Sequence, residues 1–333
     1  MSTFCEIPIS VLDLAVITEG GSPQDSFANS LDLAQLVESL GYKRFWLAEH
    51  HNMANIASSA TSVLIGHIAG GTTTLRVGSG GIMLPNHAPL AVAEQFGTLE
   101  TLYPGRIDLG LGRAPGTDQK TAKALQRDPN APFRFPTLVK EIQQYFSSEN
   151  KKAEVRAIPG EGLDIPIWIL GSSTDSAHLA AAYGLPYAFA SHFAPAQLHN
   201  ALKIYKAEFV PSSQLQEPYC MACVNVIAAE DDSEAKLLAT SLQKVFIGII
   251  TNNRRPLQAP DPNFKVFPEI AQVMNQFLRY SFIGGPEKVK KEISSFVDDT
   301  AVDELMITSH IYDHLSRMKS YEILKRVQEE KMK

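Results

Sequence analysis

The sequence of 333 residues is poor in cysteine, with only three residues of this type. Cys5 stands alone, and Cys220 and Cys223 form a close pair in the segment "CMAC". A low and odd cysteine count is typical of proteins from a reducing compartment, so we expect a cytoplasmic protein. The pair lies within "YCMACVNVIAA", which has the pattern of a strand, and residues three apart on a strand point to opposite faces. This geometry favours two small core residues over a redox or metal-binding pair.

Long hydrophobic runs and an excess of positive charge are also missing. No stretch approaches the roughly 18 uncharged apolar residues of a membrane span, and no basic-then-apolar segment near the start predicts a signal peptide. Lys and Arg number 30 against 36 Asp and Glu, which gives a formal net charge of −6. Non-specific binding to nucleic acid or to an anionic membrane needs clustered Lys and Arg, so we expect neither partner.

Short apolar runs alternate with longer amphipathic segments along the whole chain. Buried strands that are each followed by a helix predict a parallel sheet. Eight such units fit an α/β protein with a closed (β/α)8 TIM barrel, and an open doubly wound sheet is the alternative. The expected strands are 8–16, 44–49, 75–83, 106–112, 166–171, 187–191, 219–229 and 303–309, and the expected helices are about 22–41, 58–70, 89–102, 135–148, 174–183, 195–209, 232–250 and 313–329.

Two segments exceed what a minimal barrel needs. Residues 113–134 follow the fourth expected strand, and residues 251–282 form an insertion after the seventh strand and its helix. Long loops in a compact domain are usually lids or binding loops. Because no linker separates the units, we expect residues 1–333 to form one domain.

Chemistry in such a barrel is carried by residues at the carboxyl ends of the strands. These positions are rich in glycine, hydroxyl groups and histidine, and carboxylates are scarce. They are Asp13, Glu49, His50, His51, Gly78 to Gly81, Gly112, Arg113, Gly171 to Ser173, Ser191, His192, Ser309 and His310.

The segment "LGSSTDSAHLAA" (170–181) has the strongest pattern of an anion site. Gly171 ends a strand, and a helix then begins whose free N–H groups and dipole favour negative charge. The hydroxyls of Ser172, Ser173 and Ser176 add hydrogen-bonding groups for a phosphate. Helix capping by Ser173 explains the pattern equally well. Asp175 counts against a dianion unless its carboxylate turns outward.

Arg113 strengthens the phosphate interpretation, because it directly follows the neighbouring fourth strand in "GLGRAPG". A guanidinium at this place can pair with an anion held by the loop after the fifth strand. The alternative is a surface arginine. The segment is not a dinucleotide-binding fingerprint, because the spacing is wrong and a polar loop follows in place of a helix.

The segment "VGSGG" (77–81) places Gly78, Gly80 and Gly81 near the end of the third strand. Glycine weakens a strand, but it allows a flat ligand to approach the backbone closely. A bulge in a crowded barrel is the alternative.

The segment "AEHH" (48–51) raises the question of a metal site. Adjacent residues of a strand point to opposite sides, so Glu49, His50 and His51 do not all converge on one ion. Asp13 is the one further carboxylate within reach. We therefore predict no metal site, and a single histidine, His50, that points into the pocket.

Several segments together resemble the bacterial luciferase-like flavin-dependent monooxygenases. The resemblance covers nearly the whole chain, and it is closest to small single-chain oxidoreductases of this superfamily. It rests on "GYKRFWLAEHHNM", "LRVGSGGIMLPNHAPLAVAEQFGTLETLYPGRIDLGLGRAPGTD", "IPIWILGSSTDSAHLAA", "GLPYAFASHF" and "FIGGPEKVKKEISSF".

The resemblance implies an FMN-binding barrel that is commonly a homodimer. A separate reductase supplies reduced FMN, which reacts with O₂ to form a C4a-peroxyflavin that oxidises a small organic substrate. His50 matches an active-site histidine of the family, and Gly80–Gly81 matches a cis peptide beneath the isoalloxazine. The positions that match phosphate-binding places are Arg113, Ser172, Ser173 and Ser176.

Three other functions stay open from the sequence. A hydride-transfer oxidoreductase that depends on the deazaflavin F420 uses the same superfamily barrel. A metal-dependent barrel hydrolase and a flavin-binding protein without catalysis are further alternatives. The substrate is not predicted, because loops form the pocket walls and loops vary most.

Overall fold

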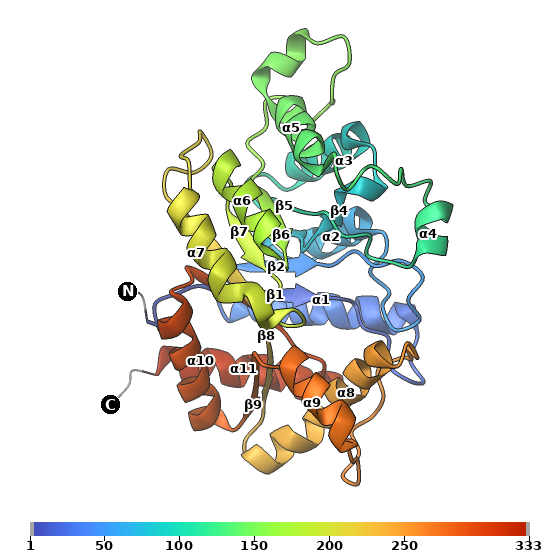
Figure 1. The fold of residues 1–333 in the computed structure, drawn as a ribbon, viewed down its shortest axis with the longest axis vertical. Coiled ribbons are helices and arrows are strands. Elements are labelled where there is room, and N and C mark those ends of the chain that lie inside the picture. The colour runs from blue at the N-terminus through green and yellow to red at the C-terminus, as the bar shows by residue number, and fades with distance from the viewer. Residues whose placement is uncertain (1–2, 331–333) are drawn as a thin grey trace.

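In the computed structural model, which describes residues 3–330, eight parallel strands close into a barrel (Figure 1). The barrel closes because the last strand pairs with the first, Leu305 opposite Ile9, and also with its other neighbour, Leu305 opposite Ala222. The predicted (β/α)8 barrel is therefore confirmed, and the open sheet is wrong. The strands are β1 (Ile9–Asp13), β2 (Arg44–Leu47), β3 (Arg76–Ser79), β5 (Ile107–Gly112), β6 (Ile167–Gly171), β7 (Tyr187–Phe189), β8 (Cys220–Ala228) and β10 (Glu304–Thr308).

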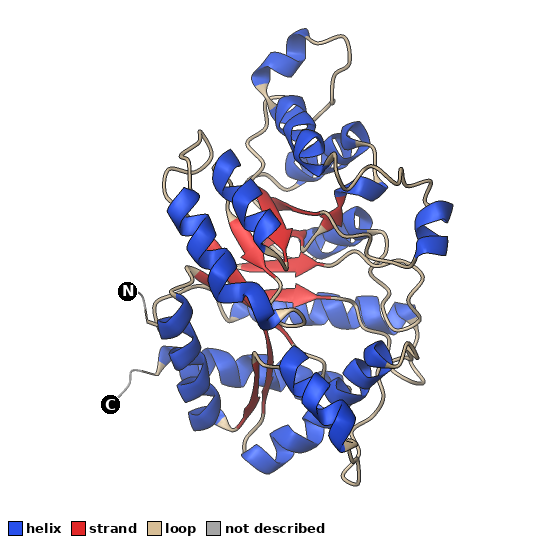
Figure 2. Ribbon diagram, in the orientation of Figure 1, coloured by secondary structure: helices blue, strands red, loops and turns tan. Residues whose placement is uncertain are grey.

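Helices surround the strands on the outside, as Figure 2 shows. The first of them begins with a capping box, in which the Ser22 hydroxyl accepts from the N–H of Asp25 at 3.2 Å and the Asp25 carboxylate accepts from the N–H of Ser22 at 2.8 Å. No helix between residues 3 and 330 is long and apolar enough to cross a lipid bilayer. The helices are α1 (Pro23–Ser39), α2 (Thr61–Gly70), α3 (Pro89–Leu102), α4 (Gln119–Ala124), α5 (Phe135–Phe146), α6 (Thr174–Tyr183), α7 (Leu198–Glu208), α8 (Asp232–Ile250), α9 (Pro268–Phe277), α10 (Pro286–Thr300) and α11 (His314–Glu329).

Two expected segments differ from the structure. The expected strand 75–83 is divided into β3 and a short strand β4 (Ile82–Met83), and both pair with β5. The expected insertion 251–282 contains α9 and runs into a strand, β9 (Ser281–Gly284), that the sequence analysis missed together with α10. β9 pairs with the second half of β8, where Asn225 lies opposite Ser281, so it extends the sheet beyond the barrel.

The core has two layers. The inner layer fills the barrel and includes Trp46 and Trp168, whose rings meet edge to face at 5.2 Å. The outer layer lies between the strands and the helices. Cys220 belongs to the outer layer and Cys223 to the inner one, which confirms that they point to opposite faces. Burial raises the pKa of the Cys220 thiol to about 12, so it is unreactive at neutral pH.

Charged side chains close the barrel at the amino ends of its strands. The buried Arg44 guanidinium lies between two buried carboxylates, with Nη1 2.7 Å from Asp108 and Nε 2.7 Å from Glu304. Arg76 adds a second contact to Asp108 at 2.6 Å, and the Tyr219 hydroxyl donates to Glu304 at 2.8 Å. We call Arg44, Arg76, Asp108 and Glu304 the amino-end network. Arg44, Asp108 and Glu304 are buried, so the network fills this end of the barrel with paired charges.

Candidate functional site

A cavity of about 310 Å³ opens at the carboxyl ends of the strands. Its walls are partly apolar, with Leu12, Leu14 and Leu170 among the lining residues. The structure brings nearly all of the predicted site residues to this one cavity. The exception is Gly81, which does not line the cavity but follows Gly80, a lining residue. The predicted residues that line it are His50, Gly80, Arg113, Gly171, Ser172, Ser173 and Ser176.

The amino end of α6 borders the cavity without a serine cap. Ser173 takes the N-cap position, but its side chain accepts no capping hydrogen bond, so the capping explanation of this segment is wrong. Gln197 accepts from the N–H of Thr174 at 3.2 Å. The hydroxyls of Ser172 and Ser173 donate to no residue within the described chain, and they remain available to an anion.

Ser176 is held more tightly than the other two serines. Its hydroxyl donates to the carbonyl of Ser173 at 2.8 Å and lies 3.0 Å from the hydroxyl of Tyr187. A Cβ atom on Gly171 would lie 1.8 Å from the Ser176 oxygen, so only glycine fits beside it. The end of β6 and the first turn of α6 are thus packed against each other.

Arg113 reaches the same end of the cavity from the loop after β5. Its Nη2 lies 3.1 Å from the carboxylate of Asp175, and both side chains are well exposed, at 48% and 67%. Asp175 therefore turns toward solvent and pairs with Arg113. A phosphate at this place has to compete with Asp175 for the guanidinium.

The peptide bond between Gly80 and Gly81 is cis, which agrees with the geometry that the resemblance implied. Each glycine is closely surrounded. A Cβ on Gly80 would lie 2.6 Å from Leu12 Cδ1, and a Cβ on Gly81 would lie 2.7 Å from the Gly110 carbonyl oxygen. Side chains are excluded here, and the backbone itself forms the cavity wall at Gly80.

His50 faces the cavity with a defined tautomer. Its Nδ1 lies 3.3 Å from the carbonyl oxygen of Gly116. A carbonyl only accepts, so Nδ1 carries the proton and Nε2 holds a lone pair. Burial lowers the pKa of His50, and the charge of Arg254 acts in the same direction, whereas the bond to Gly116 opposes them. The ring is neutral at neutral pH and accepts at Nε2.

Glu49 points away from His50 and fixes the neighbouring loop. Its buried carboxylate accepts from Nε2 of His51 and of His87, both at 2.9 Å, and from the N–H of Met83 at 3.0 Å. Burial opposes the ionisation of Glu49, but these hydrogen bonds outweigh it and lower the pKa to about 2. Glu49 and His51 hold the chain that follows the cis peptide, and His87 is a partner that the sequence analysis did not identify.

The further carboxylate considered for a metal site is engaged elsewhere. Asp13 lies 2.7 Å from Nη2 of Arg317 and is fully buried. Within residues 3–330, no group of three or more His, Cys, Asp or Glu side chains has the geometry to hold a metal ion.

His192 lines the cavity on the side of β7, and the sequence analysis gave it no role beyond its place at a strand end. The side chain of Asn225 donates to its carbonyl at 2.7 Å. Burial, with further contributions from His310 and His50, lowers the pKa of His192 to about 3, so the ring is neutral.

The insertion after α8 is tied to the loop that follows β1. The N–H of Leu257 donates to Ile17 and the carbonyl of Leu257 accepts from Glu19, both at 2.8 Å. Leu257 is thus fixed to the chain that follows β1.

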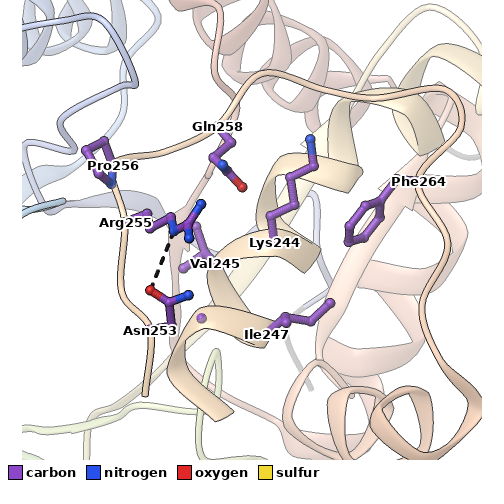
Figure 3. A pocket seen from close by; sticks show the side chains of 9 residues that line it. Lys244, Val245, Ile247, Asn253, Arg255, Pro256, Gln258 and Phe264 are labelled. Carbon is purple, nitrogen blue, oxygen red and sulfur yellow. Dashed lines mark hydrogen bonds between the residues drawn. The ribbon is translucent and has the colours of Figure 1, made fainter. Parts of the chain in front are cut away.

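A second cavity, of about 270 Å³, lies between α8 and this insertion (Figure 3). Lys244 points along it and donates to the carbonyl of Ala259 at 2.8 Å, while Arg255 lies 3.5 Å from the side chain of Asn253. None of the predicted site residues lines this cavity. The candidate site is therefore the barrel cavity alone.

Comparison with known proteins gives one family. The family model described as luciferase-like monooxygenase matches residues 7–304. A luciferase-like monooxygenase of Escherichia coli K12 is 50% identical over 327 residues, covering 97% of this chain and 98% of that protein. The N-acetyl-S-alkylcysteine monooxygenase of Bacillus subtilis is 31% identical over 327 residues, covering 96% and 97%.

Solved structures share the fold along nearly the whole chain. Apo-MsnO8 has a TM-score of 0.86 and 32% identity, covering 97% of this chain and 98% of that one. The FMN complex of the oxygenating constituent of 3,6-diketocamphane monooxygenase has a TM-score of 0.75 and 15% identity, covering 96% and 97%. An F420-dependent secondary alcohol dehydrogenase has a TM-score of 0.71 and 16% identity, covering 98% and 99%.

Proposed function

The chain belongs to the luciferase-like monooxygenase family, and from this premise we propose that it uses reduced FMN and O₂ to oxygenate a small organic substrate. A separate flavin reductase would supply the reduced FMN, and the protein would act as a homodimer. The observation that supports the proposal is the cavity itself, in which serine hydroxyls with Arg113, a glycine wall and a neutral histidine meet.

The residues present fit FMN. The hydroxyls of Ser172 and Ser173, the amino end of α6 and the guanidinium of Arg113 together suit a phosphate monoester. The Gly80–Gly81 peptide offers a flat, side-chain-free wall for the ring system. When bound, reduced FMN would supply two electrons to O₂, so that one oxygen atom enters the product and the other leaves as water.

The protein's own residues would position the reactants and protect them from water. His50 is neutral and presents Nε2 as an acceptor, so it can hold a proton of the cofactor or of the substrate at that atom. The apolar side chains of Leu12, Leu14 and Leu170 exclude water from the cavity.

F420-dependent hydride transfer is the second candidate, because an F420-dependent dehydrogenase shares the fold. F420 also carries a phosphate, so the anion site fits both cofactors. The two functions differ in their need for O₂. We expect the purified protein to bind FMN, and we expect product to form aerobically with reduced FMN and an added reductase. N-acetyl-S-methylcysteine is a first substrate to assay. Anaerobic turnover with reduced F420 would instead establish the second candidate.

The phosphate site is tested with Arg113→Ala. Removal of a charge-assisted contact should weaken FMN binding about tenfold or more, while riboflavin, which has no phosphate, should bind as to the wild type. Titration of flavin fluorescence measures both constants. Arg134→Ala is the matched control, because this exposed arginine of the same loop region makes only contacts of 3.9 Å. Equal losses for FMN and riboflavin would contradict a phosphate role.

A further inference from the structure

His192 is held firmly at the rim of the barrel, just after β7. The hydroxyl of Ser191 donates to the carbonyl of Cys223 at 2.6 Å, and the Asn225 side chain donates to the carbonyl of His192 at 2.7 Å. The ring of Phe193 meets the imidazole edge to face at 4.8 Å. The backbone of His192 is therefore fixed to β8, and its side chain lines the cavity that His50 also lines.

The imidazole of His192 has no hydrogen-bond partner among the described residues. Its Nδ1 is buried and unpaired. An occupant of the cavity can reach the ring only at Nε2, which also has no partner but is not among the buried atoms. Because polar groups in protein interiors nearly always have a partner, the free Nε2 on the cavity wall indicates that an occupant supplies one. The ring is neutral, because burial lowers its pKa to about 3. It can donate one hydrogen bond and accept one.

The same arc of the rim holds further unpaired polar atoms. Asn225 Oδ1 at β8, and Ser309 Oγ and His310 Nδ1 after β10, are buried without a partner. β7, β8 and β10 are neighbours in the barrel. The opposite arc, at the ends of β5 and β6, contains Arg113, which is the only charged residue that lines the cavity among residues 3–330. We call the side with Arg113 the anion-binding arc and the side with His192 the neutral polar arc. Within the neutral polar arc His192 lines the cavity, whereas Asn225, Ser309 and His310 lie behind its wall.

We propose that His192 contacts the organic substrate and forms a hydrogen bond with an uncharged polar group, such as a carbonyl or amide oxygen. The inference rests on the proposed function, because it assigns the anion-binding arc to the cofactor and the neutral arc to the substrate. A carboxylate or an ammonium group finds no opposite charge near His192, whereas a neutral oxygen finds a neutral donor. The group of the substrate that contacts His192 is therefore uncharged, as the amide of N-acetyl-S-methylcysteine is.

The test uses the full-length protein with and without FMN and two probes of similar shape. Cyclohexanone has a carbonyl oxygen, and methylenecyclohexane has a CH₂ group in its place. Binding is followed by the ring ¹⁵N shifts of labelled histidine, with the His192 signals assigned from their loss in His192→Phe. His192→Gln keeps a hydrogen-bonding group. His178→Phe is the control, because His178 is half exposed on α6 and pairs with Glu208 outside the cavity.

We expect cyclohexanone to bind the wild type about fivefold more tightly than methylenecyclohexane, and to shift the ring nitrogens of His192. His192→Phe should abolish this preference, His192→Gln should retain part of it, and His178→Phe should leave it unchanged. An unchanged preference in His192→Phe, an unmoved His192 signal, or no binding of cyclohexanone would each overturn the inference. FMN titration of the same samples is read separately, so a failure to bind FMN would refute the proposed function and not the role of His192.

Discussion

The two ends of the barrel satisfy their polar groups in opposite ways. In the amino-end network every charged side chain has a partner at short distance, as Arg44 does with Asp108 and Glu304, both at 2.7 Å. At the carboxyl end, His192, Ser309 and His310 keep buried polar atoms without partners. Paired buried charges stabilise the fold. Of the residues with unpaired atoms, His192 lines the cavity, where a ligand can contact its ring. The difference separates the end that stabilises the barrel from the end at which we propose that ligands bind.

A single strand connects the two ends. β2 begins at Arg44, in the amino-end network, and runs to Leu47, from which the chain continues to His50 at the cavity. The charge network therefore holds the first residue of the strand that leads to His50. Substitutions at the two ends should nevertheless have different effects. We expect those at the amino end to lower the free energy of unfolding and those at the carboxyl end to weaken ligand binding.

The largest expected effect comes from Arg44→Met. This change leaves Asp108 and Glu304 buried without their shared cation, so we expect the free energy of unfolding to fall by about 3–5 kcal/mol. Urea unfolding measures it, and intrinsic fluorescence is a direct signal because Trp46 and Trp168, the only two tryptophans, lie inside the barrel. Arg113→Met at the open end should change this free energy by less than about 1 kcal/mol. If Arg44→Met and Arg113→Met lowered the free energy of unfolding equally, the proposed difference between the two ends would be wrong.

Glu49 is an exception at the carboxyl end of the barrel, because its buried carboxylate has hydrogen-bond partners. Glu49→Gln tests what these hydrogen bonds contribute to stability. The pKa of Glu49 is lowered to about 2 in the folded protein, against about 4.3 when unfolded. Its stabilisation is therefore complete above about pH 4.3 and is lost as the pH falls toward 2, and it amounts to about 3 kcal/mol.

We expect wild-type protein to lose stability more steeply than Glu49→Gln over this window, as measured by urea unfolding at a series of pH values. Parallel curves for the two proteins would show that Glu49 contributes no such pH dependence. Glu154→Gln is a suitable control for the substitution, because Glu154 lies in an exposed loop.

The barrel was predictable because each of its strands has its own apolar run followed by an amphipathic helix. β9 was not predictable, because Ser281–Gly284 is short and partly buried and forms a strand by pairing with β8. That pairing is a contact between distant parts of the chain. The helix α10 was overlooked although Pro286 at its first position and its amphipathic pattern were visible in the sequence.

The site was predictable as a set of positions, since strand ends of a closed barrel converge. The contacts that the side chains make at these positions were not predictable. Three of these contacts depend on loop conformations and side-chain rotamers. They are Arg113 with Asp175, Glu49 with His87, and His50 with Gly116. No periodicity or spacing encodes these. The unpaired ring of His192 is likewise visible only once its neighbours are placed.

The smallest expected effect tests the ion pair between Arg113 and Asp175, at the end of the cavity where we propose that the phosphate binds. Arg113 and Asp175 lie 3.1 Å apart and are both well exposed, so their contact contributes little to stability. Asp175→Asn should leave the free energy of unfolding within about 0.5 kcal/mol of the wild type. It should also free the guanidinium, so we expect FMN to bind up to about fivefold more tightly, with riboflavin unchanged. In Arg113→Ala/Asp175→Asn the gain should disappear, because no guanidinium is left to be freed. A gain that persists in the double variant would mean that Asp175 repels the phosphate directly, and the open end would then be tuned by repulsion and not by competition for Arg113.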